Sequence, residues 1–216
     1  MNSEKTSNNS YQRASAGVEN QFKPRTGLSF REFSINATNP DKATGVVVQL
    51  MPVSGLIMLR AGRDLDSLES ALERHCDLTL PAKLSCHSSD SLCISWLSPD
   101  AWLLCCSIDR TADLVLALRE ASSGHVAIVD VSGGYSQLRL RGGDARSVLM
   151  KSTAYDVHPD NFPPNKVVNT VFAKTQATVR CITSDDYELT IRRSFAVYVL
   201  QWLLRAGEEF SISVQS

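Results

Sequence analysis

The hydrophobic and polar positions of the chain follow a pattern that occurs twice. In the first occurrence, residues 55–61 have the composition of a strand, and leucines three and four residues apart mark one face of a helix over 65–75. In the second, residues 135–141 alternate as a strand and lead into a short helix over 145–149. Both strands follow Val-Ser-Gly, end in Leu-Arg and precede Gly and Asp. The pattern predicts two weakly similar halves.

The remainder of each half also follows a common order. Residues 92–97 and 102–107 predict a hairpin around the turn Ser98-Pro99-Asp100, followed by a helix over 111–121 and a strand over 125–131. Asp109 and Ser194 stand where N-caps of helices are expected, and Asp66 with Glu69 has the spacing of a capping box. In the second half, the predicted strands are 166–173, 177–183 and 187–191, and a helix carries Phe195, Tyr198, Trp202 and Leu203 on one face.

This order predicts an α+β fold made of two pseudo-repeated ferredoxin-like βαββα units, about 46–131 and 132–210. The Ser- and Asn-rich residues 1–27 have the composition of a disordered tail, so the folded domain is expected over 28–216. Residues 28–35 predict a short edge strand, and 85–91 predict a loop.

Composition and charge exclude several classes of function. With 22 basic and 23 acidic residues among 216, the net charge of -1 provides no field that would attract nucleic acid or an anionic membrane surface, and we expect neither as a partner. No apolar run reaches the length of about 18 residues that a membrane span requires. The six cysteines form no CxxC pair and lie mostly in apolar runs, which favours a reducing cytoplasm.

No familiar catalytic or metal-binding motif is present. The chain has no GxSxG elbow and neither of the common phosphate-binding loops. Zinc ligands could be imagined among His75-Cys76, Cys86-His87 and Cys93, but these spacings match no metal site, and core thiols with exposed imidazoles are the preferred interpretation. We therefore expect no catalytic residue, no cofactor and no metal ion on this chain.

Several charged and glycine residues allow two interpretations. The pairs Gly133-Gly134 and Gly142-Gly143 suggest a phosphate cradle, although positive φ at two strand ends is the preferred reading. Arg192-Arg193 precede a predicted helix N-terminus and either meet an anionic partner or lie in a solvated turn. Asp156 and His158 form either an acid-base pair or local backbone hydrogen bonds, the latter preferred. A basic patch or merely outward-facing residues are predicted for Arg139, Arg141, Arg146 and Lys151.

Four motifs in this order resemble the gamma subunit of heterotetrameric sarcosine oxidase. The resemblance extends from about residue 46 to 210. Its motifs are Leu97-Ser98-Pro99-Asp100-Ala101-Trp102-Leu103-Leu104, Asp130-Val131-Ser132-Gly133-Gly134-Tyr135, Asp156-Val157-His158-Pro159 with Phe162-Pro163-Pro164, and Arg192-Arg193-Ser194-Phe195-Ala196 with Tyr198 and Trp202-Leu203.

The resemblance implies a non-catalytic subunit with the fold of the folate-binding domain of the glycine-cleavage aminomethyltransferase. Its partners would be alpha, beta and delta subunits, which carry FAD, FMN, NAD, tetrahydrofolate and zinc. Their complex oxidatively demethylates sarcosine to glycine and yields hydrogen peroxide with formaldehyde or 5,10-methylenetetrahydrofolate. Candidate interface residues on this chain are then Trp102, Arg192, Arg193, Phe195 and Trp202.

The sequence leaves three other functions open. The first is an equivalent subunit of a demethylase for a related N-methyl amino acid, and the second is a stand-alone folate-binding one-carbon protein. The third is a regulatory module that binds a small ligand between two ferredoxin-like units. A folate titration of the isolated chain would distinguish the folate-binding protein from the subunit, and ligand-induced stabilisation of the chain alone would support the regulatory module.

Overall fold

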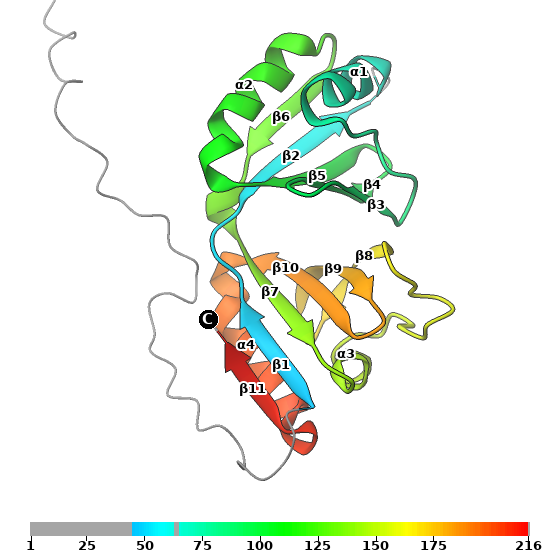
Figure 1. Cartoon of the computed structure of the whole chain (residues 1–216), viewed down its shortest axis with the longest axis vertical. Helices are drawn as coiled ribbons and strands as arrows, with labels where there is room; N and C mark the ends of the chain where they lie inside the picture. Colours follow the sequence, from blue (N-terminus) through cyan, green and yellow to red (C-terminus); the bar gives the residue numbers. More distant parts are fainter. Residues whose placement is uncertain (1–44, 63–64, 216) are drawn as a thin grey trace, which may run out of the picture.

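The structure, a computed structural model, describes residues 45–62 and 65–215. Within these residues the chain forms two β-sheets, each with two α-helices on one face (Figure 1). The predicted tail over 1–27 and the predicted strand over 28–35 lie outside the described residues. No helix in the described part is both long and apolar enough to cross a membrane.

The first sheet has the strand order β3-β4-β5-β2-β6 and carries α1 and α2. Its core forms because Ile57 and Leu59 alternate onto one face of β2 and meet Leu68 and Leu72 of α1 and Leu118 of α2, all fully buried. The elements are β2 (Gly55–Ala61), α1 (Leu65–Cys76), β3 (Cys86–Ser88), β4 (Cys93–Ser98), β5 (Ala101–Cys106), α2 (Thr111–Ala121) and β6 (Val126–Asp130).

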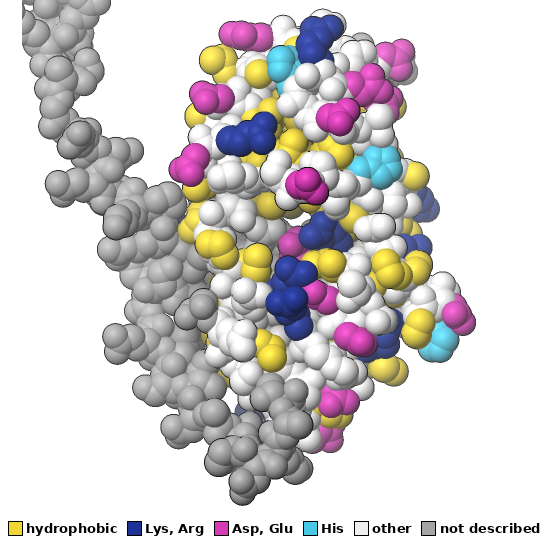
Figure 2. All heavy atoms as spheres, in the orientation of Figure 1, with side chains coloured by type: hydrophobic (Ala, Val, Ile, Leu, Met, Phe, Trp, Pro, Cys, Tyr) yellow, Lys and Arg dark blue, Asp and Glu magenta, His cyan; other side chains and the backbone are white. Residues whose placement is uncertain are grey.

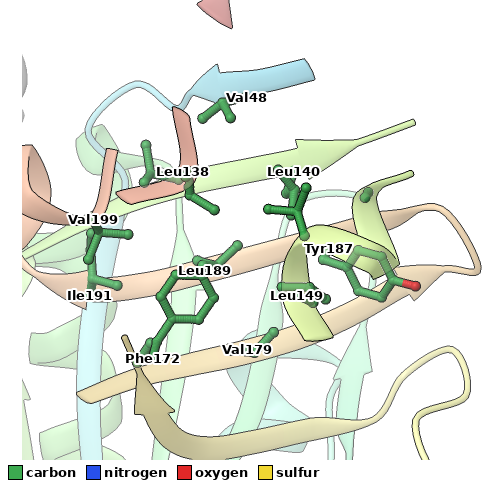
Figure 3. Close-up of a cluster of buried hydrophobic side chains, with 14 of the residues drawn as sticks. Val48, Leu138, Leu140, Leu149, Phe172, Val179, Tyr187, Leu189, Ile191 and Val199 are labelled. Atoms are coloured by element: carbon green, nitrogen blue, oxygen red, sulfur yellow. The ribbon is translucent and has the colours of Figure 1, made fainter. Parts of the chain in front are cut away.

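The second sheet has the order β11-β1-β7-β10-β9-β8 and carries α3 and α4. Figure 3 shows how Val48, Leu138, Leu189 and Phe172 from four strands extend toward the same side, where Val199 of α4 joins them. The elements are β1 (Val46–Leu50), β7 (Tyr135–Arg141), α3 (Ala145–Ser152), β8 (Val167–Phe172), β9 (Thr175–Thr183), β10 (Asp186–Arg192), α4 (Ala196–Ala206) and β11 (Ile212–Gln215).

The two sheets share one strand order, and this confirms the predicted duplication of the α+β plan. When β7, β8, β9 and β10 are matched with β2, β3, β4 and β5, the orders β8-β9-β10-β7 and β3-β4-β5-β2 are the same. The predicted hairpin of β4 and β5 and the predicted strand β7 are also present. Two short strands, β3 within the expected loop over 85–91 and β11 near the end of the chain, were not predicted.

The predicted start of the first half at residue 46 is wrong. Strand β1 belongs to the second sheet, where it pairs antiparallel with β7 and parallel with β11. It occupies the place next to β7 that β6 occupies next to β2. The alternation of Val46 and Val48 reveals a one-sided strand but not its partner, because either sheet would bury the same face.

The predicted helix caps are also corrected. Asp109 and Ser194 lie inside short 3-10 helices, η1 (Ile108–Arg110) and η3 (Arg193–Phe195), that lead directly into α2 and α4. Neither helix has a capping bond from an N-cap side chain. Glu69 does not complete a capping box with Asp66 but accepts a hydrogen bond from the backbone of Leu80 at 3.3 Å. The two halves thus begin their second helix in the same way, by backbone geometry.

The faces of the two sheets that carry no helices meet in the middle of the molecule. Gln137 of β7 donates to the thiol of Cys105 on β5 at 3.9 Å, and Asn169 of β8 donates to the carbonyl of Leu97 on β4 at 2.6 Å. Figure 1 shows the resulting order of layers, with α1 and α2 at one end, the sheets between, and α3 and α4 at the other end. Two apolar cores therefore lie outside a more polar contact between the sheets.

Glycine is required at Gly142, where β7 leaves the second sheet. Its φ is +119°, and a Cβ there would lie 2.3 Å from the carbonyl oxygen of Gly45, just before β1. Gly133 and Gly134 have no positive φ and belong to the 3-10 helix η2 (Ser132–Gly134). The prediction of positive φ at both strand ends is therefore wrong for Gly133-Gly134.

Candidate functional site

The imagined zinc ligands do not converge on one point, although Cys86 and Cys93 are neighbours in the sheet. His75 and Cys76 lie in the last turn of α1, and His87 turns toward Thr79, whose Oγ1 is 3.1 Å from its Nδ1. Cys86 and Cys93 lie on the facing strands β3 and β4. Within the described ranges, no group of three His, Cys, Asp or Glu residues is placed to hold a metal ion.

The four basic residues predicted as a patch are separated by contacts within the chain. Arg139 makes two hydrogen bonds of 2.7 and 2.6 Å to Asp186, and Arg141 reaches the same carboxylate at 3.3 Å. Arg146 donates to the carbonyls of Val157 and Ser184, and Lys151 pairs with Glu209. These side chains hold loops and strand ends in place instead of forming one patch.

The loop after α3 uses its polar residues for local structure. Asp156 accepts hydrogen bonds from the backbone of His158, at 2.9 Å, and from the side chain of Asn161. These two bonds, the backbone one first, hold the pKa of Asp156 below its usual value. Phe162 of the same loop is buried and stacks on Tyr187, with ring centroids 6.1 Å apart. The preference for local hydrogen bonds over an acid-base pair is therefore supported.

Two of the motifs noted above meet on one surface between the halves, which we call the crossover surface. It consists of η2, η3, Tyr135 and Arg192. Arg192 stacks over the Tyr135 ring, with its guanidinium carbon 4.5 Å from the ring centroid, and η2 contacts η3. Phe195 is 44% exposed, whereas Arg193 is half-buried with contacts inside the chain.

The two tryptophans among the candidate interface residues have different places. Trp102 is 4% exposed and belongs to the core under α1 and α2, so the structure corrects its assignment as a surface contact. Trp202 is half-buried on α4 and donates a hydrogen bond of 3.0 Å to the hydroxyl of Ser152 at the end of α3. Both residues stabilise the packing of helices on their sheets.

Polar side chains between the two sheets form a cluster that the sequence analysis did not identify. Arg180 on β9 and Glu188 on β10 are cross-strand neighbours, 3.3 Å apart. Gln137 of β7 contributes hydrogen bonds of 3.5 Å to Glu188 and 3.4 Å to Thr190. In Figure 2, basic and acidic side chains lie next to one another at mid-height, the level at which Figure 1 places β7 and β10.

Arg180 extends this cluster to the thiols of the first sheet. Its Nη1 lies 2.6 Å from Cys93 Sγ on β4 and 3.2 Å from Ser88 Oγ on β3. The pKa of Cys93 is held below its usual value, first by a hydrogen bond from the Cys86 thiol and then by the Arg180 guanidinium, against the effect of burial. The same interaction with Cys93, in which Cys86 keeps its thiol proton, raises the pKa of Cys86. Cys93 is therefore the thiol in this cluster that most favours the thiolate.

A pocket of about 360 Å³ opens beside this cluster. Residues 88–93 line one side, and Asn165, Arg180 and Ile182 line the other, with Cys105 and Cys181 also at its wall. The lining combines hydroxyl, thiol, amide, carboxylate and guanidinium groups with the apolar side chains of Leu92 and Ile182, and it contains no aromatic ring. Such a mixed pocket suits a small molecule better than a flat heterocycle that stacks on aromatic side chains.

One contact of this cluster, between Arg180 and Glu188, could have been predicted from the sequence. A hairpin turn at 184–186 between two predicted strands places Arg180 within reach of Glu188, and that pair could have been deduced from the register. The contact of Arg180 with Cys93 could not, because the residues are 87 positions apart and belong to different sheets.

Comparison with solved structures defines the class of fold. The glycine cleavage system aminomethyltransferase T from Bartonella henselae matches with a TM-score of 0.58 and 13% identity over 80% of this chain and 48% of that one. Heterotetrameric sarcosine oxidase from Corynebacterium sp. U-96, in complex with pyrrole 2-carboxylate, matches with a TM-score of 0.77 and 24% identity over 88% of this chain and 97% of the matched chain. The chain therefore has the aminomethyltransferase-like α+β fold.

Sequence comparison then identifies the family. Residues 62–209 match the sequence model of the "Sarcosine oxidase, gamma subunit family", so the chain belongs to this family. The sarcosine oxidase subunit gamma of Corynebacterium sp. (strain U-96) is 29% identical over 145 residues, which are 66% of this chain and 70% of the relative. That of Corynebacterium sp. (strain P-1) is 29% identical over 126 residues, 57% of this chain and 61% of the relative.

Proposed function

We propose that this chain is the non-catalytic gamma subunit of a heterotetrameric sarcosine oxidase that oxidatively demethylates sarcosine to glycine. Formaldehyde or 5,10-methylenetetrahydrofolate and hydrogen peroxide are the other products. The observation that carries the proposal is the family match over residues 62–209, which includes all but the first two strands and the end of the second half. The cytoplasm is the compartment in which the complex works.

In this proposal the alpha, beta and delta subunits hold FAD, FMN, NAD, tetrahydrofolate and zinc. Two features of this chain support that division. The pocket between the halves has no aromatic side chain in its lining against which a flavin or pterin ring could stack. The charged residues between the sheets are already paired, Arg180 with Glu188 and Arg139 with Asp186, which suits structural contacts.

The crossover surface is our candidate for contact with a companion subunit. Phe195 in η3 exposes a large aromatic side chain, and Arg192, just before η3, stacks on Tyr135. Aromatic and arginine side chains are enriched among the residues that dominate interface energies. Beyond Gly133 and Gly134 there is open space, so another chain can approach the backbone closely. These features make Arg192 and Phe195 the anchors to be tested.

Co-expression with the three companion subunits, one of them carrying an affinity tag, tests the proposal. The unmodified chain is expected to co-purify in stoichiometric amount, and the complex to release peroxide when sarcosine is added. The chain alone is expected to have no such activity. Sarcosine oxidation by the isolated chain, or failure to co-purify with any companion, would contradict the proposal.

The double variant Arg192→Ala/Phe195→Ala tests the assigned surface. Loss of two anchors is expected to lower recovery in the complex by tenfold or more, since each buried anchor contributes about 2 kcal/mol or more to binding. The free energy of unfolding of the chain itself should change by about 1 kcal/mol or less. Arg74→Ala/Leu116→Ala, which alters two exposed residues on α1 and α2, is the matched control and should assemble normally.

A second candidate is a stand-alone folate-binding one-carbon protein, which the fold shared with aminomethyltransferase T favours. Calorimetric titration of the isolated chain with tetrahydrofolate distinguishes the two functions. Saturable binding favours this candidate, and absence of binding favours the subunit. A demethylase subunit for another N-methyl amino acid differs only in substrate, so activity of the purified complex with N-methyl amino acids other than sarcosine identifies it.

A further inference from the structure

Three cysteines of the first sheet face the second sheet from neighbouring strands. Cys93 and Cys105 are direct partners in the register of β4 and β5, and Cys86 lies diagonally across from Cys93 on β3. Directly opposed residues of antiparallel strands have Cα atoms about 4.5–5.5 Å apart, a separation that a disulfide can span. Diagonal neighbours are about 7–8 Å apart, at or beyond this limit. Cys105 is therefore the preferred disulfide partner of Cys93.

The charges around Cys93 favour its thiolate. Arg180 Nη1 lies 2.6 Å from its sulfur, and Ser88 Oγ donates to it at 3.5 Å. Glu188 opposes this effect but is 3.3 Å from Arg180 on its other terminal nitrogen, and the Cys105 thiol stays neutral because burial raises its pKa to about 12.

Small molecules can reach this thiol. Cys93 is half-buried and lines the pocket of about 360 Å³ together with Cys105 and the serine-rich residues 88–91. The Nε of Arg180 is buried and has no hydrogen-bond partner among the described residues. An oxygen atom added to the Cys93 sulfur would bring an acceptor to this guanidinium.

We propose that Cys93 is a site of reversible oxidation by hydrogen peroxide, with Cys105 as the resolving thiol. The thiolate sulfur attacks one peroxide oxygen, so that an S–O bond forms, the O–O bond breaks, and the departing hydroxide takes a proton from solvent. Sulfur is oxidised to the sulfenic acid and the peroxide is reduced. The Cys105 sulfur then attacks the Cys93 sulfur, an S–S bond forms, and the hydroxyl leaves with the Cys105 proton as water.

This oxidation changes the contact between the two halves. Cys93 belongs to the first sheet and Arg180 to the second, and the bond between them is charge-assisted while the thiol is ionised. A disulfide has no negative charge, so Arg180 loses this partner when Cys93 is oxidised. The two sheets are then held together less tightly at the pocket. The inference concerns only this chain and does not depend on the proposed function.

Peroxide labelling of the full chain tests the site. The reduced protein is treated with hydrogen peroxide near equimolar amount in the presence of a 1,3-diketone that traps sulfenic acids, and labelled peptides are identified by mass spectrometry. Label is expected on Cys93 first, and without the trap a Cys93–Cys105 disulfide is expected. Cys105→Ser should preserve the sulfenic acid. Cys181→Ser is the matched control and should behave as the unmodified chain, because it removes a fully buried thiol on the same pocket wall that donates to the carbonyl of Thr183.

Arg180→Met tests the cause. Its labelling rate at pH 7 is expected to fall about tenfold or more, because a thiol with the usual pKa of about 8.5 is only about 3% thiolate at pH 7, whereas one with a pKa of about 6 is mostly thiolate. If this variant does not fold, the pH profile of Cys93 alkylation by iodoacetamide in the unmodified chain replaces it, with a midpoint expected below the usual thiol pKa of about 8.5. Labelling of Cys93 no faster than Cys181, a folded Arg180→Met variant with the unmodified rate, or a disulfide to Cys86 in place of Cys105 would overturn the proposal.

Discussion

The ion pairs Arg60–Asp100 and Arg139–Asp186 occupy equivalent places in the two halves. In each, the arginine lies near the end of the first matched strand, β2 or β7, and the aspartate lies at the turn between the matched strands β4 and β5 or β9 and β10. The first pair is exposed, with 59% and 47% of its side-chain surfaces accessible, whereas the second has 26% and 10%. Equivalent sequence positions thus have different environments.

Strand β1 and the contact between the sheets explain much of this difference. β1 covers the edge of β7, whereas β2 has only the edge strand β6 on the corresponding side. The second sheet also presents Arg180, Glu188 and Gln137 to the first one. The first sheet contributes thiols and small side chains to this contact. The halves therefore share one plan but differ in what surrounds it, and equivalent substitutions should have unequal effects.

The largest effect is expected from Val48→Asp on β1. Val48 is fully buried in the core of the second half, and an unpaired carboxylate there should lower the free energy of unfolding by about 3 kcal/mol or more. Hydrogen exchange should show loss of protection in β7 and β11 rather than in β2. Gln49→Asp, on the less buried face of the same strand, is the control. A loss of protection centred on β2 would show that β1 belongs to the first half.

A smaller effect is expected at the equivalent glycines that follow the strands β2 and β7. Gly142→Ala places a Cβ against the carbonyl of Gly45 at a positive φ and should destabilise the chain by about 1–3 kcal/mol. Gly62→Ala meets nothing within 4 Å and should change stability by about 0.5 kcal/mol or less. Urea unfolding of both variants measures the difference. Equal losses would show that the two strand ends have the same environment.

The smallest effect is expected at the two ion pairs. Arg139→Met leaves Asp186, which is mostly buried, with Arg141 alone and should cost about 1–2 kcal/mol. Arg60→Met removes an exposed pair and should cost about 1 kcal/mol or less. The comparison is made by denaturant unfolding at low and high salt, because screening should reduce the contribution of the exposed pair more. A larger loss for Arg60→Met would reverse the assignment of the buried pair.

The predictions from sequence succeeded where a short stretch carries its own pattern. The alternation over 135–141 and the Pro-Asp turn at 98–100 correspond to β7 and to the β4–β5 hairpin. Predicted helix caps failed at Asp109 and Ser194, because 3-10 turns supply the backbone geometry at these places. Trp102 was expected at an interface from its residue type alone, but burial depends on the neighbouring elements, and it lies in the core.

The sequence by itself determined most of the elements, their duplicated order and the family, because period, turn residues and motifs are properties of neighbouring positions. Only the tertiary structure decided the strand pairing of β1, the burial of Arg139 with Asp186, and the meeting of Arg180 with Cys93. The reason is physical. Strand pairing and burial depend on contacts between segments far apart along the chain, and alternative pairings of a strand satisfy the same local pattern equally well.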